Sequence, residues 1–361
     1  MSKQPFRQFS PNWVIPPGAT IADLLEEQGW SQTEFASRMG YTKKHVNLLI
    51  QGKASLTEDA AIKLERVLGS TVSFWLNREA LYREALAKKE DLNQLNDSVP
   101  WLKKLPLKDM LHFGWIKNWA DKRELVAECL KFFGVASVNA WELKYQSPIA
   151  AFRSSKLTDK HKGATSAWLR QGERQIFEIS CMPFNRVTFL SALEKVRNLT
   201  QEEQEEIFIP KLIQICADAG VALAIVRAPK GCPVSGAIRW LGSEKALITL
   251  SDRYKTNDQF WFSFFHEAGH LLLHSKKLWF IDVEGQLNNE QEKEADKFAS
   301  QTLIPLQYNS QLFKLSKSEK AVRSFAKEMG IAPGIVVGRM QKEEILPWSH
   351  LNKLKIKLEK L

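Results

Sequence analysis

Hydrophobic residues recur at helical spacing through the first part of the chain, and polar positions interrupt the pattern at short intervals. Ser31, Thr42 and Thr57 stand where helix N-caps are expected, and a glycine follows each of the first four helical stretches. The predicted helices cover residues 21–28, 32–39, 43–51, 58–68 and 72–92. The pattern therefore predicts an all-α domain over residues 1–92.

The pattern changes after residue 92 and again at residue 201. Residues 93–100 are polar and end in Pro100, which is typical of a linker, and residues 101–200 read as mainly helical. Further on, the pattern predicts helices at 202–219, 257–274 and 290–303, a helical tail at 316–361, and β-rich runs at 221–227, 234–240 and 246–251. Turn residues between the runs predict a small meander.

These changes predict a multidomain chain. The expected parts are an all-α domain over 1–92, a mainly helical middle region over 93–200, an α+β core with a small antiparallel-containing sheet over 201–305, and a helical C-terminal subdomain over 306–361. The pattern gives no role for the middle region.

Length and cysteine usage narrow the class of protein. At roughly 150 residues per domain, a chain of 361 residues holds two or three domains. No apolar run approaches the ~18 residues that span a bilayer, and the first residues lack the apolar stretch of a signal peptide. The four cysteines are scattered without a CxxC pair, which argues against a disulfide framework or a cysteine metal site. We predict a cytoplasmic protein with no membrane partner.

The net charge of +10 is unevenly distributed. Residues 97–200 hold 17 Lys and Arg against 10 Asp and Glu, a surplus of +7, whereas residues 1–96 hold 12 against 11. A basic middle region could follow phosphates, and a solvated basic face explains it equally well.

Residues 31–52 have the spacing of two short helices joined by a tight turn. Phe35, Ala36 and Met39 would face the next helix, which leaves polar side chains outward near the start of that helix. A recognition helix presents its base-reading residues at this place, and lysine and asparagine suit guanine and adenine. The outward residues are Lys43, Lys44, His45 and Asn47. A plain helical hairpin remains the alternative, because a near-neutral domain binds phosphates poorly.

The stretch from SQTEFASRMGYTKKHVNLLIQGK to FWLNREALY resembles the lambda-repressor-like (Cro, XRE) helix-turn-helix domain, and most closely that of antitoxins of the HigA type, whose domain also ends in a segment like Phe74-Trp75-Leu76-Asn77. The resemblance covers about residues 15–90. It implies binding to a double-stranded DNA operator, and a homodimer is a possible form. The implied DNA contacts are Gln32, Thr42, Lys43, Lys44, His45 and Asn47.

The apolar helix predicted over 257–274 contains an HExxH sequence. His266 and His270 lie four residues apart and therefore share one helix face, so that both imidazoles can reach one zinc ion. Glu267 follows directly and is placed to act as the general base toward the water that zinc activates.

A catalytic zinc needs a third protein ligand, and the helix predicted over 290–303 offers one. Glu292 and Asp296 are four residues apart, which suits a ligand and a carboxylate that holds an imidazole N–H. Glu294 points away from Glu292 and is the weaker ligand candidate, and a solvated charge run is the alternative for both. His274 lies two turns from His266, which favours a group beside the ligands over a third ligand.

The motifs SGAIRWLGSEKALITLS, WFSFFHEAGHLLLH and EKEADKFASQTLIP resemble, in this order, the ImmA/IrrE metallopeptidases, a gluzincin-like group. The resemblance covers about residues 205–305 and implies limited proteolysis of a repressor. By motif match it implies that His266, His270 and Glu292 are zinc ligands and that Glu267 is the catalytic base. The family usually has a larger apolar residue at the position of Ala268. The oxyanion-stabilising group is open, with Arg253 and Tyr254 as guesses.

The leading hypothesis is a DNA-binding, antitoxin-type transcriptional regulator fused to a zinc-dependent endopeptidase that cleaves a repressor or itself. One alternative is a non-proteolytic antitoxin or repressor that has a structural or sensory zinc site and binds a toxin. Another is a free-standing protease whose N-terminal domain docks protein.

Overall fold

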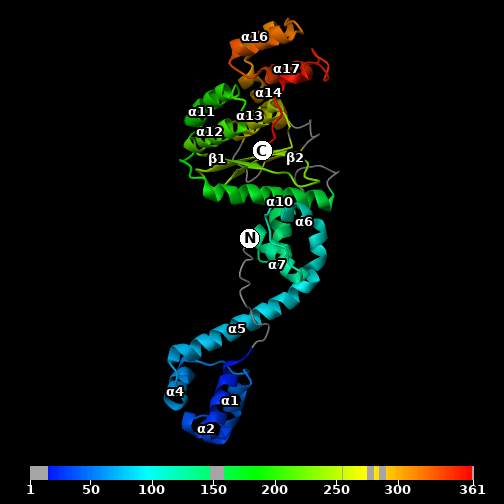
Figure 1. Cartoon of the computed structure of the whole chain (residues 1–361). Helices are drawn as coiled ribbons and strands as arrows, with labels where there is room; N and C mark the ends of the chain where they lie inside the picture. Colours follow the sequence, from blue (N-terminus) through cyan, green and yellow to red (C-terminus); the bar gives the residue numbers. More distant parts are fainter. Residues whose placement is uncertain (1–14, 147–157, 254, 275–279, 284–289, 360–361) are drawn as a thin grey trace, which may run out of the picture. The chain divides into compact units, whose positions relative to one another are not determined.

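The computed structural model describes all residues except 1–14, 147–157, 254, 275–279, 284–289 and 360–361. The chain forms two compact units, one up to Asp97 and one from Ser98 to Leu361 (Figure 1). No helix within the described ranges combines the length and the apolar character that a membrane span needs. The expected multidomain, helix-rich architecture with a small sheet is confirmed.

The first unit consists of helices around one apolar core. They are α1 (Pro17–Glu27), α2 (Gln32–Met39), α3 (Lys43–Ile50), α4 (Glu58–Leu68) and α5 (Val72–Gln94). Ser31, Thr42 and Thr57 each accept a backbone N–H through the side-chain oxygen, as expected of N-caps. The fully buried side chains of Phe35, Val46 and Trp75 hold the helices together.

Two glycines allow the tight geometry around α3. Gly40 ends α2 at a φ of 66°, a left-handed conformation that a residue without Cβ adopts at little cost. Gly18 in α1 lies against the end of α3, where a Cβ would overlap the backbone of Ile50. The turn between α2 and α3 is therefore short, and Lys43 and Lys44 at the start of α3 are exposed.

A mainly helical region follows, and its first element crosses the sequence boundary between the two units. Its elements are η1 (Leu95–Lys104), α6 (Leu107–His112), α7 (Lys122–Phe133), α8 (Val138–Trp141), η2 (Glu142–Gln146), α10 (Asp159–Gln175), η3 (Ile176–Glu178), α11 (Arg186–Leu199) and α12 (Glu205–Asp218). Buried aromatic rings pack between η1, α7 and α8: Trp141 lies edge to face with Trp101 and with Phe133, and the rings of Trp101 and Phe133 are tilted against each other. Three tryptophans of this region, Trp101, Trp141 and Trp168, therefore belong to its buried core, whereas Trp119 is exposed.

The sheet follows in sequence and is mixed. Its strands are β1 (Val221–Val226), β2 (Val234–Trp240), β3 (Ala246–Ser251) and β4 (Phe280–Val283), in the order β1-β3-β2-β4. The expected meander is wrong, because β3 lies between β1 and β2 and pairs in parallel with β1. The loop over residues 227–233 is long enough to pass one strand, and β3, which is buried at every residue, takes the central position.

Helices cover both faces of this sheet (Figure 1). On one face, α10 approaches β3 so closely that a Cβ at Gly172 would lie 2.6 Å from Thr249 Oγ1, and Trp168 donates its indole N–H to the carbonyl of Val226. On the other face, Ile238 and Ile248 join the core of α13 (Asn257–Leu273). The middle region therefore packs against the same sheet as the HExxH helix.

The remaining helices complete the core around α13. They are α14 (Glu290–Leu303), η4 (Leu306–Tyr308), α15 (Asn309–Phe313), α16 (Glu319–Met329), α17 (Pro333–Lys342) and η5 (Asn352–Leu354). Side chains of α16 and α17 belong to the same apolar cluster as α13. The backbone of Ile356 also accepts a hydrogen bond from Asn257 at the start of α13. The C-terminal helices thus help to hold the HExxH helix in place.

Candidate functional site

The HExxH residues lie in the C-terminal half of α13. Most positions of this helix are apolar, and the helix is buried nearly all round, which the hydrophobic run FWFSFFHEAGHLLL requires. His266, Glu267 and His270 are 6%, 1% and 2% exposed. Buried polar groups at these positions need partners, so their neighbours define the site.

Three donor atoms from two helices converge on one point. The Nε2 atoms of His266 and His270 lie 3.0 Å apart, and Glu292 Oε2 lies 3.2 Å from the first and 3.4 Å from the second. Three ligands of a tetrahedral zinc ion at ~2.0–2.1 Å would lie ~3.3–3.4 Å from one another. The donor set and its spacing therefore fit a zinc ion held by these residues.

Each imidazole is held on its other side. Asp296 Oδ1 lies 2.9 Å from Nδ1 of His266, and His274 Nδ1 lies 2.9 Å from Nδ1 of His270. Glu294 Oε2 continues the second chain at 3.0 Å from Nε2 of His274. These contacts fix the ring orientation and leave both Nε2 atoms directed at the common point.

The electrostatics favour the ligand forms of the side chains. Burial alone would raise the pKa of Glu292, but hydrogen bonds and charge from His266 and His270 lower it to about 2. Burial lowers the pKa of His270, and its contact with Glu292 opposes that shift. An ionised carboxylate and neutral imidazoles are the forms that bind metal.

Glu267 lies against the sheet. Gly236 in β2 faces α13, and a Cβ at this position would overlap the carboxylate of Glu267. A register shift between β2 and β4 occurs at Val234 and Gly236. The site of the predicted general base therefore depends on a glycine in a neighbouring strand.

Small residues bring α14 close to α13. A Cβ at Gly269 would lie 3.2 Å from Cα of Ala295 and 3.1 Å from the ring of Phe298. Ala295 and Ala299 are fully buried in this contact. The close approach carries Glu292 to the two histidines, although its own side chain remains 24% exposed.

The helix-turn-helix candidates lie at the starts of α2 and α3. Thr42, Lys43, Lys44 and Asn47 are exposed, whereas Gln32 and His45 are partly buried. The Thr42 hydroxyl accepts the N–H of His45, whose ring packs edge to face on Tyr41 at 4.7 Å. The exposed set lies on one end of α3, with Gln32 beginning the preceding helix.

Comparisons with known proteins agree with both candidate sites, the helix-turn-helix and the HExxH site. The Helix-turn-helix family matches residues 21–75, and the IrrE N-terminal-like domain family matches residues 234–340. The uncharacterized HTH-type transcriptional regulator YddM of Escherichia coli (strain K12) is 40% identical over 84 residues, which cover 23% of this chain and 89% of that protein. The chain belongs to the helix-turn-helix regulators and carries an IrrE N-terminal-like domain. The resemblances to an XRE-type domain and to the ImmA/IrrE group are confirmed.

The bounds of the two family matches coincide only in part with the helices and strands of the structure. The helix-turn-helix match contains α2, α3 and α4, and it ends at Trp75, the buried anchor of α5. The match to the IrrE N-terminal-like domain begins at Val234, the first residue of β2, and continues into α17. Strand β1, which belongs to the same sheet, and helices α10 and α12, which pack on it, lie outside this match.

Not every predicted residue lies at the metal point. His274 caps the end of α13 and contacts a ligand instead of the point itself. Arg253 donates to the carbonyl of Cys232, and Tyr254 lies outside the described residues. The contact of Glu294 with His274 and the role of Gly236 were not predicted. Glu294 stands two residues after Glu292 in a charged run, and only the packing of α14 against α13 distinguishes it from a solvated side chain.

Proposed function

We propose that the protein is an antitoxin-type, DNA-binding transcriptional regulator whose IrrE N-terminal-like domain is a zinc-dependent endopeptidase, acting on a repressor protein or on this chain. The observation that carries the peptidase half is the convergence of His266, His270 and Glu292 beside the buried carboxylate of Glu267. Zinc, when bound there, supplies Lewis acidity that polarises a carbonyl and makes water a nucleophile at neutral pH. The gluzincin-like character belongs to the same proposal.

The residues of the chain have separate tasks in this proposal. His266, His270 and Glu292 hold the metal, and Glu267 takes a proton from the attacking water and passes it to the leaving amine. Asp296 and His274 keep the two imidazoles in the orientation in which Nε2 faces the common point. The tight packing of α13 and α14 maintains this arrangement before substrate arrives.

The test uses the zinc-loaded full chain and a library of peptides made by tryptic digestion of a bacterial lysate. We expect new termini in the library, detected by mass spectrometry, and no such termini with Glu267→Gln, which keeps its zinc. Cleavage by Glu267→Gln at the wild-type rate would contradict the assigned base. Zinc binding without cleavage of the library or of the chain itself would favour a non-proteolytic regulator.

For the DNA-binding half, we propose that the start of α3 reads an operator in the major groove, with Lys43, Lys44 and Asn47 as contacts and Gln32, Thr42 and His45 beside them. The exposure of Thr42, Lys43, Lys44 and Asn47 at the start of α3, in a unit that belongs to the helix-turn-helix regulators, supports this assignment. Two copies would bind two half-sites, as helix-turn-helix dimers do. The toxin partner rests on the HigA-like segment Phe74-Trp75-Leu76-Asn77 alone.

Selection of bound sequences from a random double-stranded DNA pool tests this half. We expect an inverted repeat with half-sites about one helical turn apart. The Asn47→Ala variant should bind with lower preference for one base pair in each half-site. If the protein retains no DNA at low salt, the result would favour the alternative that this unit binds a protein.

A further inference from the structure

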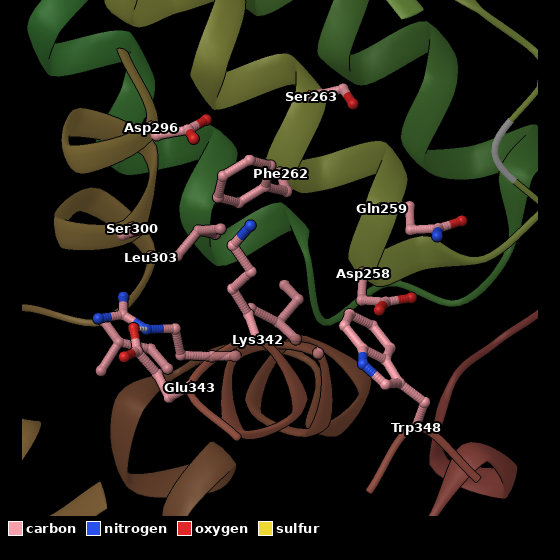
Figure 2. A pocket seen from close by; sticks show the side chains of 14 residues that line it. Asp258, Gln259, Phe262, Ser263, Asp296, Ser300, Leu303, Lys342, Glu343 and Trp348 are labelled. Atoms are coloured by element: carbon pink, nitrogen blue, oxygen red, sulfur yellow. Dashed lines mark hydrogen bonds and ion pairs between the residues drawn. The ribbon is translucent and has the colours of Figure 1, made fainter. Parts of the chain in front are cut away.

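A pocket of about 320 Å³ lies in the second unit, between α13, α14 and α17. Its apolar wall includes Phe262, Leu303 and Ile335, and Trp348, which is 66% exposed, stands at its rim (Figure 2). Pockets of a few hundred Å³ suit a small organic group. This pocket is not made by the metal ligands, although it lies one turn along α13 from His266.

The charged side chains of the pocket are paired except one. Asp258 pairs with Lys355 at 2.7 Å and Glu343 with Arg339 at 2.8 Å, while Asp296 holds His266. Lys342, by contrast, takes part in no hydrogen bond or ion pair with the residues that the structure describes. Figure 2 shows its side chain extending from α17 toward Phe262 with the nitrogen in the pocket.

An ammonium group above an apolar wall favours a ligand that has both an apolar part and a negative charge. An apolar group fills the space beside Phe262 and Leu303, and an anionic group on it can pair with the exposed ammonium group of Lys342 through a charge-assisted hydrogen bond. We propose that this pocket binds an apolar group that carries a carboxylate, with Lys342 as the residue that recognises the charge.

The pocket also adjoins the metal point. Asp296 lines it and contacts His266, and the ring of Phe262 lies 6.3 Å from the ring of His266. An occupant of the pocket would therefore lie against Asp296, which holds His266, and against Phe262, its neighbour on α13. The carboxylate can belong to a free small molecule or to a residue of a peptide, and the chemistry of recognition is the same for both.

The test measures binding of 3-phenylpropionate and of its neutral analogue 3-phenylpropionamide to the zinc-free full chain by calorimetry. Without zinc, the carboxylate cannot bind to the metal, so any binding that is measured belongs to the pocket. The result therefore does not depend on the peptidase proposal. We expect the carboxylate to bind about tenfold more tightly than the amide. Lys342→Met should remove this preference, whereas the control Lys327→Met, an exposed lysine on α16, should keep it.

Ser300→Phe fills the pocket and should abolish binding of both compounds while zinc binding is retained. Absence of binding by wild type at ~10 mM of either compound overturns the proposal. Equal binding of the two compounds, or a preference that survives in Lys342→Met, overturns the role of Lys342.

The peptide library separates the two sources of the carboxylate. A changed preference of Lys342→Met at one position relative to the cleaved bond assigns the occupant to the substrate. An unchanged preference, together with a change of the cleavage rate by 3-phenylpropionate, assigns it to a free ligand.

Discussion

The two candidate sites of this chain are built in opposite ways. In the first unit, the candidate DNA contacts are short-range neighbours on one exposed helix end, and the core behind them contains Phe35, Val46 and Trp75. In the second unit, the metal site gathers buried and partly buried polar groups from α13 and α14, and Glu267 lies against Gly236 of β2. A residue of a surface site can be replaced with little effect on its neighbours. In a buried polar site, loss of one residue leaves its hydrogen-bond partner unsatisfied, which costs stability.

This difference predicts where substitutions act. Changes at the start of α3 should alter DNA binding and leave folding and zinc intact. Changes at the metal site should affect neighbours in other elements, because the same packing that buries His266 and Glu267 also supports the sheet and α17.

The largest effect is expected from His266→Ala. Zinc affinity, measured by competition with a chromophoric chelator, should fall by more than roughly 100-fold. Loss of a residue that only holds a ligand in place, such as Asp296, costs up to roughly that much. His350→Ala, which removes an exposed histidine, is the matched control and should bind zinc normally. DNA binding by the His266→Ala variant should be unchanged, and its loss would mean that the two sites are not separable.

The next effect concerns Gly236. An alanine there overlaps the Glu267 carboxylate, and forced overpacking in a core costs about 1–3 kcal/mol. Chemical denaturation should show this loss for Gly236→Ala, and truncation by Glu267→Ala in the same chain should recover most of it. A double variant no more stable than Gly236→Ala would show that the strand and the glutamate are not in contact.

Removal of the carboxylate behind His266 should have an intermediate effect. Asp296→Ala frees Nδ1 of His266, and zinc affinity should fall about 10–100-fold. Lys297→Ala, its exposed neighbour, serves as the control. Equal zinc affinities of the two variants would exclude a positioning role for Asp296.

The smallest effects are expected on α3. Lys44→Met should weaken operator binding a few-fold at ~0.15 M salt and reduce the slope of log affinity against log salt by about 1, the value for one phosphate contact. The control Lys88→Met changes a lysine paired with Glu84 on α5. A slope unchanged from wild type would remove Lys44 from the interface.

Local signals made the helices predictable. The N-caps Ser31, Thr42 and Thr57 fix the starts of α2, α3 and α4, since each needs only its own backbone neighbours. The spacing of His266 and His270 likewise places both imidazoles on one face of α13, and Glu292 comes near them on the next helix of that core.

Long-range pairing was less predictable. The parallel pairing of β1 with β3 places a strand that is buried at every residue inside the sheet, and the turn residues encode neither this order nor the addition of β4. The contact of Gly236 with Glu267 joins residues from a strand and a helix, and the pocket at Lys342 needs α17 to fold back onto α13. Such features exist only after the elements have packed.

The central claim is that one metal ion is held by two imidazoles and the Glu292 carboxylate. X-ray diffraction at the zinc absorption edge, on crystals of the zinc-loaded full chain, tests it most directly. The account predicts one anomalous peak at ~2.0–2.1 Å from Nε2 of both His266 and His270 and within coordination distance of Glu292. A peak elsewhere in the chain, or no peak at full zinc loading, would contradict it.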